Sequence, residues 1–240
     1  MRARYVQQVE PGHVGQRVSV RHLVHDHERG AVPSDVVGRL GALDTEALLI
    51  IDRHGQLHSI DAQAVLSSRV IPPHPRREPE PAVGTQDAPL YRAAARALVL
   101  DPDDRVLLVA HRTQPSQPSV WTAPGGGIEP HETATEAARR ELGEELNIAA
   151  TIGQCVWKRR VTFSYRGLWL DQDEQWFLVR ADSIALAEVP LGDADTVDAS
   201  FFSLEQLGAT DVSVAPAALA LHLETLLRDG PPNEPVDVGR

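Results

Sequence analysis

The stretch from Gly125 to Ile148 constrains the fold of this chain more than any other. It begins with three consecutive glycines and continues into a segment rich in helix-forming residues and carboxylates. In a helix, residues three and four apart share a face, so Glu141 would lie over both Glu144 and Glu145. Like charges packed this closely destabilise a helix unless a cation neutralises them, and Mg²⁺ prefers oxygen ligands of this kind. The stretch therefore predicts a glycine-rich loop, a helix and a metal site.

Two local signals predict where this helix begins and ends. Thr133 is followed three residues later by Glu136, which is the spacing of a capping box. At the other end, Asn147 is compatible with a helix end, because Asn tolerates the left-handed conformation better than most residues other than Gly.

From Gly126 to Ile148 the segment resembles the Nudix box, written G-x5-E-x7-R-E-U-x-E-E-x-G-U, where U is a bulky aliphatic residue. The positions that fit this pattern are Gly126, Glu132, Arg140, Glu141, Leu142, Glu144, Glu145 and Ile148. Asn147 departs from it, because the family has glycine there. Since Asn is the next best residue at a helix end, we expect the departure to leave activity intact.

The resemblance implies an α+β fold, an α/β/α sandwich, and hydrolysis of a nucleoside diphosphate linked to another moiety. It also implies a Mg²⁺ or Mn²⁺ cofactor and a nucleotide-derived small molecule as substrate. By position in the motif, the expected metal ligands are the Gly125 carbonyl and the carboxylates of Glu141, Glu144 and Glu145. The expected catalytic set adds Arg140 and Glu132, to which we assign an orienting role.

Three alternatives stay open at this stage. The general base is either one of the helix glutamates or a later acidic residue, for which Asp193, Asp195 and Glu174 are candidates that also fit solvated loop charges. Aromatic residues of the later strands fit either a base-stacking platform or the core: Trp157, Phe163, Tyr165, Trp169 and Trp176. The protein itself could instead be a non-catalytic Nudix-fold sensor of a nucleotide or ADP-ribose. Because such sensors generally lose metal glutamates that this chain keeps, we favour the enzyme.

Residues 10–75 predict a small all-β domain. Short alternating or apolar runs predict five strands, at 17–21, 35–40, 47–51, 57–60 and 68–71. The region is similar to a small SH3-like barrel that precedes acetyltransferase domains in some bacterial proteins. Binding of a protein partner, covering of the second domain and homodimer formation are all open roles for it. His22, His25 and His27 fit either a metal cluster or a solvated loop.

The remaining chain divides by composition. Prolines and charged residues predict an extended linker at 76–89. Residues 90–228 then form the Nudix-like domain, with a β-hairpin from 91 to 110, later strands and a final amphipathic helix at 216–227. Residues 229–240 contain three prolines and predict a disordered tail.

Charge and hydropathy exclude several classes of protein. The net charge of −11 falls entirely on residues 81–240, because residues 1–80 hold equal numbers of basic and acidic side chains. An acidic domain disfavours nucleic acid as a partner. The apolar runs are too short to span a bilayer, and no signal peptide is evident. With Cys155 as its one cysteine, the chain fits a cytoplasmic location.

Overall fold

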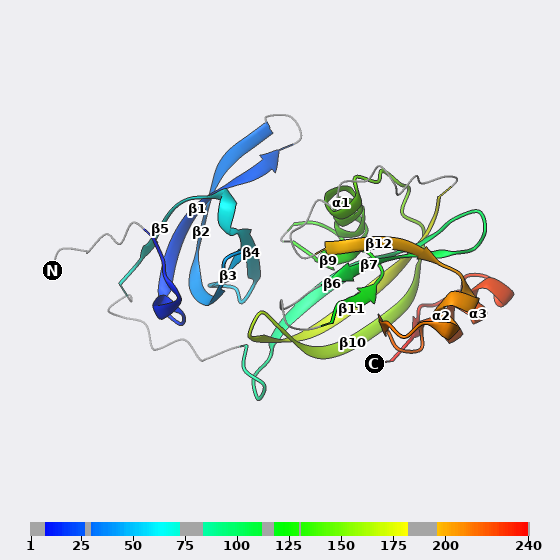
Figure 1. Cartoon of the computed structure of the whole chain (residues 1–240). Coiled ribbons are helices and arrows are strands. Elements are labelled where there is room, and N and C mark those ends of the chain that lie inside the picture. Colours follow the sequence, from blue (N-terminus) through cyan, green and yellow to red (C-terminus); the bar gives the residue numbers. More distant parts are fainter. Residues whose placement is uncertain are drawn as a thin grey trace. The chain divides into compact units, whose positions relative to one another are not determined.

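The chain forms two compact units, each built around one β-sheet (Figure 1). The computed structural model describes residues 8–26, 30–72, 84–111, 118–129, 131–181 and 196–239. The first unit comprises Met1–Leu90 with Ser164–Leu170, and the second comprises Tyr91–Phe163 with Asp171–Arg240. The predicted order of an all-β region followed by a mixed α and β region is confirmed.

The first unit holds an antiparallel five-stranded sheet in the order β4-β3-β2-β1-β5. Its elements are η1 (Pro11–His13), β1 (Arg17–Asp26), β2 (Gly30–Leu43), β3 (Ala47–Asp52), β4 (Leu57–Asp61), η2 (Ala62–Ala64) and β5 (Val65–Val70). Alternation along β1 turns Val18 and Val20 into a core that also contains Leu40 and Ile50, all fully buried. The likeness to an SH3-like barrel stays a prediction.

The second unit holds a nine-stranded sheet. Its main path runs β13-β8-β7-β6-β11-β10-β14, while β12 pairs with β7 and β9 pairs with β6. The strands are β6 (Leu90–Leu100), β7 (Val106–His111), β8 (Val120–Thr122), β9 (Gly125–Gly127), β10 (Cys155–Tyr165), β11 (Leu168–Arg180), β12 (Thr196–Phe202), β13 (Ser213–Ala215) and β14 (Val236–Asp237). The helices are α1 (Ala134–Leu146), α2 (Leu204–Ala209) and α3 (Leu219–Asp229).

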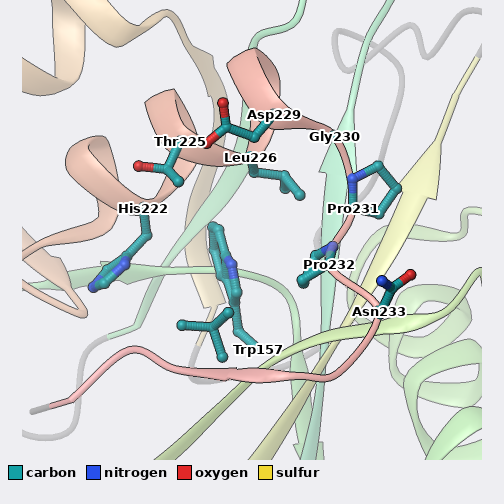
Figure 2. Close-up of a pocket in the computed structure, with 10 residues that line it drawn as sticks. Trp157, His222, Thr225, Leu226, Asp229, Gly230, Pro231, Pro232 and Asn233 are labelled. Atoms are coloured by element: carbon teal, nitrogen blue, oxygen red, sulfur yellow. The ribbon is translucent and has the colours of Figure 1, made fainter.

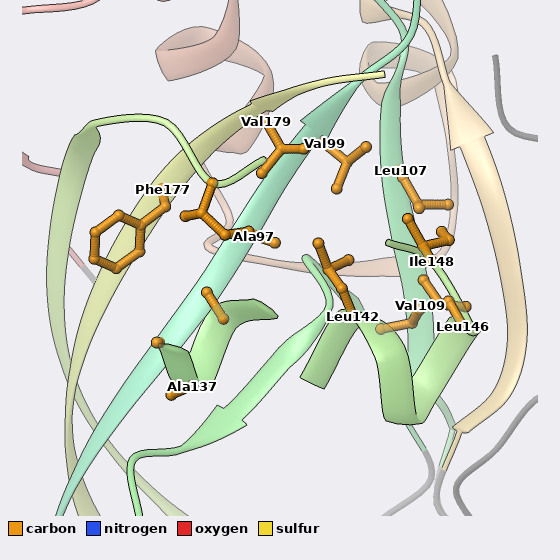
Figure 3. Packing of buried hydrophobic residues seen from close by; sticks show 13 residues of the cluster. Ala97, Val99, Leu107, Val109, Ala137, Leu142, Leu146, Ile148, Phe177 and Val179 are labelled. Carbon is orange, nitrogen blue, oxygen red and sulfur yellow. The ribbon is translucent and has the colours of Figure 1, made fainter. Parts of the chain in front are cut away.

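Helices cover both faces of this sheet. Because successive side chains of β6 point to opposite faces, this strand packs against both helix layers. Ala97 and Val99 pack with Leu142 and Leu146 of α1 in one buried cluster, which Figure 3 shows. Leu98 and Leu100 belong to a second cluster, to which α3 contributes Leu219, Leu223 and Leu226. The sheet with a helix layer on each face agrees with the expected α/β/α arrangement.

The C-terminal segment differs from the disordered tail that its prolines predicted. Val236 and Asp237 form β14, which pairs in parallel with Trp157 and Lys158 of β10. Val238 is buried in the same cluster as Trp157. Apolar burial and strand pairing thus outweigh the tendency of proline-rich segments to stay extended and solvated.

Two further expectations concern regions of limited description. Residues 73–83, which include most of the predicted linker at 76–89, lie outside the described residues, and residues 84–88 form a turn closed by the Gly84 amide on the Ala88 carbonyl. Within the described part of the chain, no helix is long and apolar enough to cross a membrane.

The contact between α1 and the sheet can be tested with Leu142→Ala. Leu142 is fully buried, so its truncation should destabilise the second unit by about 2–5 kcal/mol through lost burial and a cavity. Leu221→Ala is the matched control, because Leu221 is 62% exposed on α3 and should change the free energy of unfolding by less than about 0.5 kcal/mol. Urea denaturation followed by tryptophan fluorescence measures both. Equal effects of the two substitutions would contradict the packing described.

Candidate active site

The predicted glycine-rich loop forms a short strand, β9, which lies antiparallel to β6. Gly125, Gly126 and Gly127 pair with Arg96, Ala95 and Ala94, respectively. A Cβ atom on Gly125 would lie 2.2 Å from the Ala95 carbonyl oxygen, and Gly125 has a φ of 141°. Only glycine fits this position, because both the contact and the backbone angle exclude a side chain. The absence of side chains is therefore what lets this segment join the sheet.

Helix α1 follows β9 and carries the carboxylates. Thr133 is its N-cap and forms the expected capping box with Glu136. Asn147 ends the helix in the left-handed conformation, with φ 51° and ψ 33°, and its amide donates to the Gly143 carbonyl. Thr133 and Asn147 therefore lie at the two ends of α1, as the sequence indicated.

Arg140 connects the helix to the chain that precedes it. Its guanidinium donates to both carboxylate oxygens of Glu132, at 3.2 and 2.7 Å, and to the Gly127 carbonyl at 2.9 Å. It also donates to Glu141 at 2.9 Å and to Glu144 at 2.8 Å. Burial lowers the pKa of Arg140, but these carboxylates outweigh it and raise the pKa further above its ordinary value. One guanidinium thus faces three carboxylates, so the group keeps a net negative charge.

Glu145 lies on the inner side of α1 and is only 3% exposed. Its Oε2 accepts a hydrogen bond from the Gly125 amide at 3.0 Å. Its Oε1 lies 3.7 Å from Nε2 of His111, the last residue of β7. Glu145 therefore ties α1 directly to the backbone of the glycine strand.

Glu141 faces the same strand from the helix. A Cβ atom on Gly126 would lie 2.4 Å from Glu141 Oε1, so the carboxylate occupies the space that a side chain would take. Burial raises the pKa of Glu141, Arg140 lowers it and the nearby Glu144 raises it again, with a net shift upward. A bound cation would favour the charged form of this carboxylate.

The predicted metal ligands are the Gly125 carbonyl and the carboxylates of Glu141, Glu144 and Glu145. Their oxygen atoms and negative charge suit a hard divalent cation. As arranged here, however, Arg140 engages Glu141 and Glu144 while Glu145 bonds to the Gly125 amide. Among the described residues, no three His, Cys, Asp or Glu side chains are grouped so that they could already hold a metal ion.

Glu174, a candidate general base, lies in a strand and not in a loop. It is 1% exposed on β11, where it accepts hydrogen bonds from Gln172 at 2.7 Å and from Trp176 Nε1 at 3.0 Å. Burial alone would raise its pKa, but Arg96, Arg159 and these hydrogen bonds lower it on balance. A buried carboxylate held in its charged form by two arginines is poorly suited to take a proton.

Several other sequence candidates do not meet at this site. Trp157 and Trp176 are buried core residues with ring centroids 5.9 Å apart, whereas Phe163, Tyr165 and Trp169 are half-buried. Trp157 also lines a cleft of about 480 Å³ between α3 and the C-terminal segment, shown in Figure 2. None of the predicted catalytic or metal-binding residues lines this cleft. His22 is half-buried on β1, while His27, Asp193, Asp195 and the His25 side chain lie outside the described residues.

Sequence reasoning missed the strand residues that surround β9. Arg96 donates to the Gly125 carbonyl at 2.7 Å, and Arg92 lies so close that a Cβ on Gly127 would be 2.5 Å from its Nε. His111 and Gln172 were not singled out either. The one available signal was that Arg92 and Arg96 interrupt an otherwise apolar run of alanines and leucines.

The chain is similar in sequence to several known proteins. The family profile described as the NUDIX domain matches residues 90–223. The CTP pyrophosphohydrolase of Escherichia coli K12 is 40% identical over 60 residues, which cover 25% of this chain and 44% of that protein. The RNA pyrophosphohydrolase of Erythrobacter litoralis is 30% identical over 101 residues, which cover 38% of this chain and 61% of that protein. The chain therefore spans less than two thirds of either relative.

Among solved structures, the MutT protein from Methanosarcina mazei Go1 aligns with a TM-score of 0.45 and 22% identity. The alignment covers 60% of this chain and 98% of that chain.

The end of α1 gives a direct test of the residue at which the chain departs from the box pattern. Asn147→Ala should destabilise the second unit by about 1 kcal/mol, because alanine is strained in the left-handed conformation. Asn147→Gly should be neutral or slightly stabilising, since glycine adopts positive φ without strain. Thermal unfolding of the two variants beside the wild type measures this, and an alanine variant as stable as the glycine variant would contradict it.

Proposed function

Because the chain belongs to the Nudix family, we propose that it is a metal-dependent hydrolase that cleaves a phosphoric anhydride bond. The substrate class we propose is a nucleoside diphosphate linked to another moiety. The names of the relatives support this class without selecting one member of it, since one is named for CTP and the other for RNA.

The observation that carries the proposal is the way α1 and β9 share their polar contacts. Glu141 fills the space beside Gly126, Glu145 bonds to the Gly125 amide, and Arg140 bonds to the Gly127 carbonyl. Each of the three consecutive glycines thus lies against a different charged side chain of α1. A merely solvated helix face would not require this correspondence.

The residues that would hold the metal are the Gly125 carbonyl and the carboxylates of Glu141, Glu144 and Glu145. When bound, a Mg²⁺ or Mn²⁺ ion neutralises phosphate charge and lowers the pKa of an attacking water. Glu144 is the most accessible of the three carboxylates, with 59% of its side chain exposed. Arg140 and Glu132 would hold the carboxylates of α1 at fixed positions relative to the glycine strand.

In the proposed reaction, the oxygen of a water molecule forms a bond to one phosphorus of the substrate. The anhydride bond between that phosphorus and its bridging oxygen breaks, and the bridging oxygen leaves with the other phosphate group. A general base takes a proton from the water. Of the groups considered for this role, the helix glutamates are the best placed, because Glu174 is buried and paired with Arg96 and Arg159.

Glu145→Gln tests the proposal most directly. It keeps the size of the side chain and an acceptor for the Gly125 amide but removes the charge, so turnover should fall by about 100-fold. Chromatography of the products formed with Mg²⁺ from nucleoside triphosphates, ADP-ribose and dinucleoside polyphosphates measures it, because cleavage of ADP-ribose yields two monophosphates and no free phosphate. The matched control is Glu224→Gln on the exposed side of α3, which should leave turnover unchanged. The proposal fails if no compound is hydrolysed, or if the Glu145 variant matches the wild type.

A pair of glycine substitutions tests the contact between β9 and α1. Gly126→Ala should displace the Glu141 carboxylate, because its new Cβ would lie 2.4 Å from Oε1, and should lower turnover by about 10-fold or more. Gly143→Ala meets open space within α1 and should stabilise the helix by about 0.5–1 kcal/mol with turnover unchanged. Steady-state rates and thermal unfolding distinguish the two. Unchanged turnover in Gly126→Ala would show that the position of Glu141 is not required.

A further inference from the structure

A group of buried charged and polar side chains lies on β6, β10 and β11, beside the glycine strand. Arg96 Nε lies 3.4 Å from Glu174 Oε1, and Arg159 Nη1 lies 3.5 Å from Glu174 Oε2. The side chains of Arg96, Arg159 and Glu174 are 12%, 9% and 2% exposed. Removing such charges from water is costly unless they are paired, and here the two arginines share one carboxylate.

Of these side chains, Arg96 also bonds to the backbone at Gly125. Arg96 Nη1 donates to the Gly125 carbonyl at 2.7 Å and to the Ala123 carbonyl at 3.2 Å. On the other side of the residue, the Gly125 amide donates to Glu145. Glycine has no side chain that could restrict its backbone, so the direction of this carbonyl depends on these hydrogen bonds.

We propose that Arg96 is a positioning residue that fixes the orientation of the Gly125 peptide, whose carbonyl is a proposed metal ligand, and that Glu174 holds Arg96 in place. This inference rests on the proposed function, because it assigns a purpose to a ligand of that site. A carbonyl oxygen has two lone pairs, so one can accept from Arg96 while the other faces a cation.

The choice of arginine follows from geometry. Arg96 uses Nη1 for two carbonyls and Nε for Glu174, which a planar guanidinium can do in one fixed orientation. Lysine would keep the positive charge but present it as a single point, so it could not serve the carboxylate and both carbonyls with the same geometry.

Glu174 also balances charge. An arginine beside a cation site repels the cation, and the buried carboxylate offsets that repulsion. Because Arg96 and Arg159 favour its charged form and lower its pKa despite burial, Glu174 provides this negative charge at neutral pH. Gln172 and Trp176 donate to its two oxygens and fix its orientation.

Arg96→Lys in the 240-residue chain tests the inference, with Mn²⁺ binding followed by electron paramagnetic resonance in the absence of substrate. The affinity for Mn²⁺ should fall by about 10-fold or more, as for other residues that orient metal ligands. In turnover assays, kcat should fall while KM changes little, because the residue orients the site without touching substrate. The matched control is Arg105→Lys, which alters a different arginine paired with a buried carboxylate, Asp101, and should leave both quantities unchanged.

The outcomes separate this inference from the proposed function. If Arg96→Lys folds and binds Mn²⁺ as tightly as the wild type while Glu145→Gln does not, the inference is overturned and the function stands. If Glu145→Gln also binds Mn²⁺ and turns over like the wild type, the proposed function itself fails.

A measurement on the wild type covers the case in which Arg96→Lys does not fold. The guanidinium protons of Arg96 should exchange with solvent far more slowly in nuclear magnetic resonance spectra than those of the exposed Arg139. Equal exchange rates would mean that the bonds to Gly125 and Ala123 are not maintained, and would overturn the inference.

Discussion

The close approach of three glycines to β6 on one side and to α1 on the other is the constraint on which the site depends. A Cβ on Gly125 would meet the backbone of Ala95, and a Cβ on Gly126 would meet the Glu141 carboxylate. Backbone and carboxylates therefore lie closer together than any residue with a side chain would permit. Hydrogen bonds from peptide groups can then hold charged side chains that would otherwise repel one another.

The electrostatics of the site follow from this packing. Arg140 bonds to Glu132, Glu141 and Glu144, and the Gly125 amide bonds to Glu145, so each carboxylate has a partner. These partners supply less positive charge than the carboxylates supply negative charge. Burial raises the pKa of Glu141, because removing the carboxylate from water disfavours its charged form. The side chains around Arg140 thus carry more carboxylates than guanidinium groups, which is the charge balance that the proposed cation would offset.

Local features of the site could be predicted from the sequence. The capping box at Thr133 and the left-handed Asn147 depend only on neighbouring residues, and both lie where the sequence indicated. The mixed α and β fold of the second unit, with an all-β region before it, is also confirmed. These features share one property: the residues that determine them are adjacent or repeat with a fixed period.

The remaining features depend on contacts between distant parts of the chain. Arg96 and Glu174 are separated by 78 positions, and neither carries a local signal for the other. The strand character of the glycines requires β6 as a partner, so the sequence alone predicted a loop. In the same way, the proline-rich C-terminus predicted a disordered tail, because its pairing with Trp157 and Lys158 of β10 is not visible locally.

These distant contacts explain how the glycine strand is held in place although its residues have no side chains. The Gly125 peptide lies between a helix carboxylate and a strand guanidinium, each fixed by a different buried layer. Leu142 and Leu146 anchor α1 on one face of the sheet, while Trp176 and Glu174 lie on the other with Arg96. A shift of either layer would change the direction of the Gly125 amide or its carbonyl. The geometry of this one peptide therefore depends on packing on both faces of the sheet.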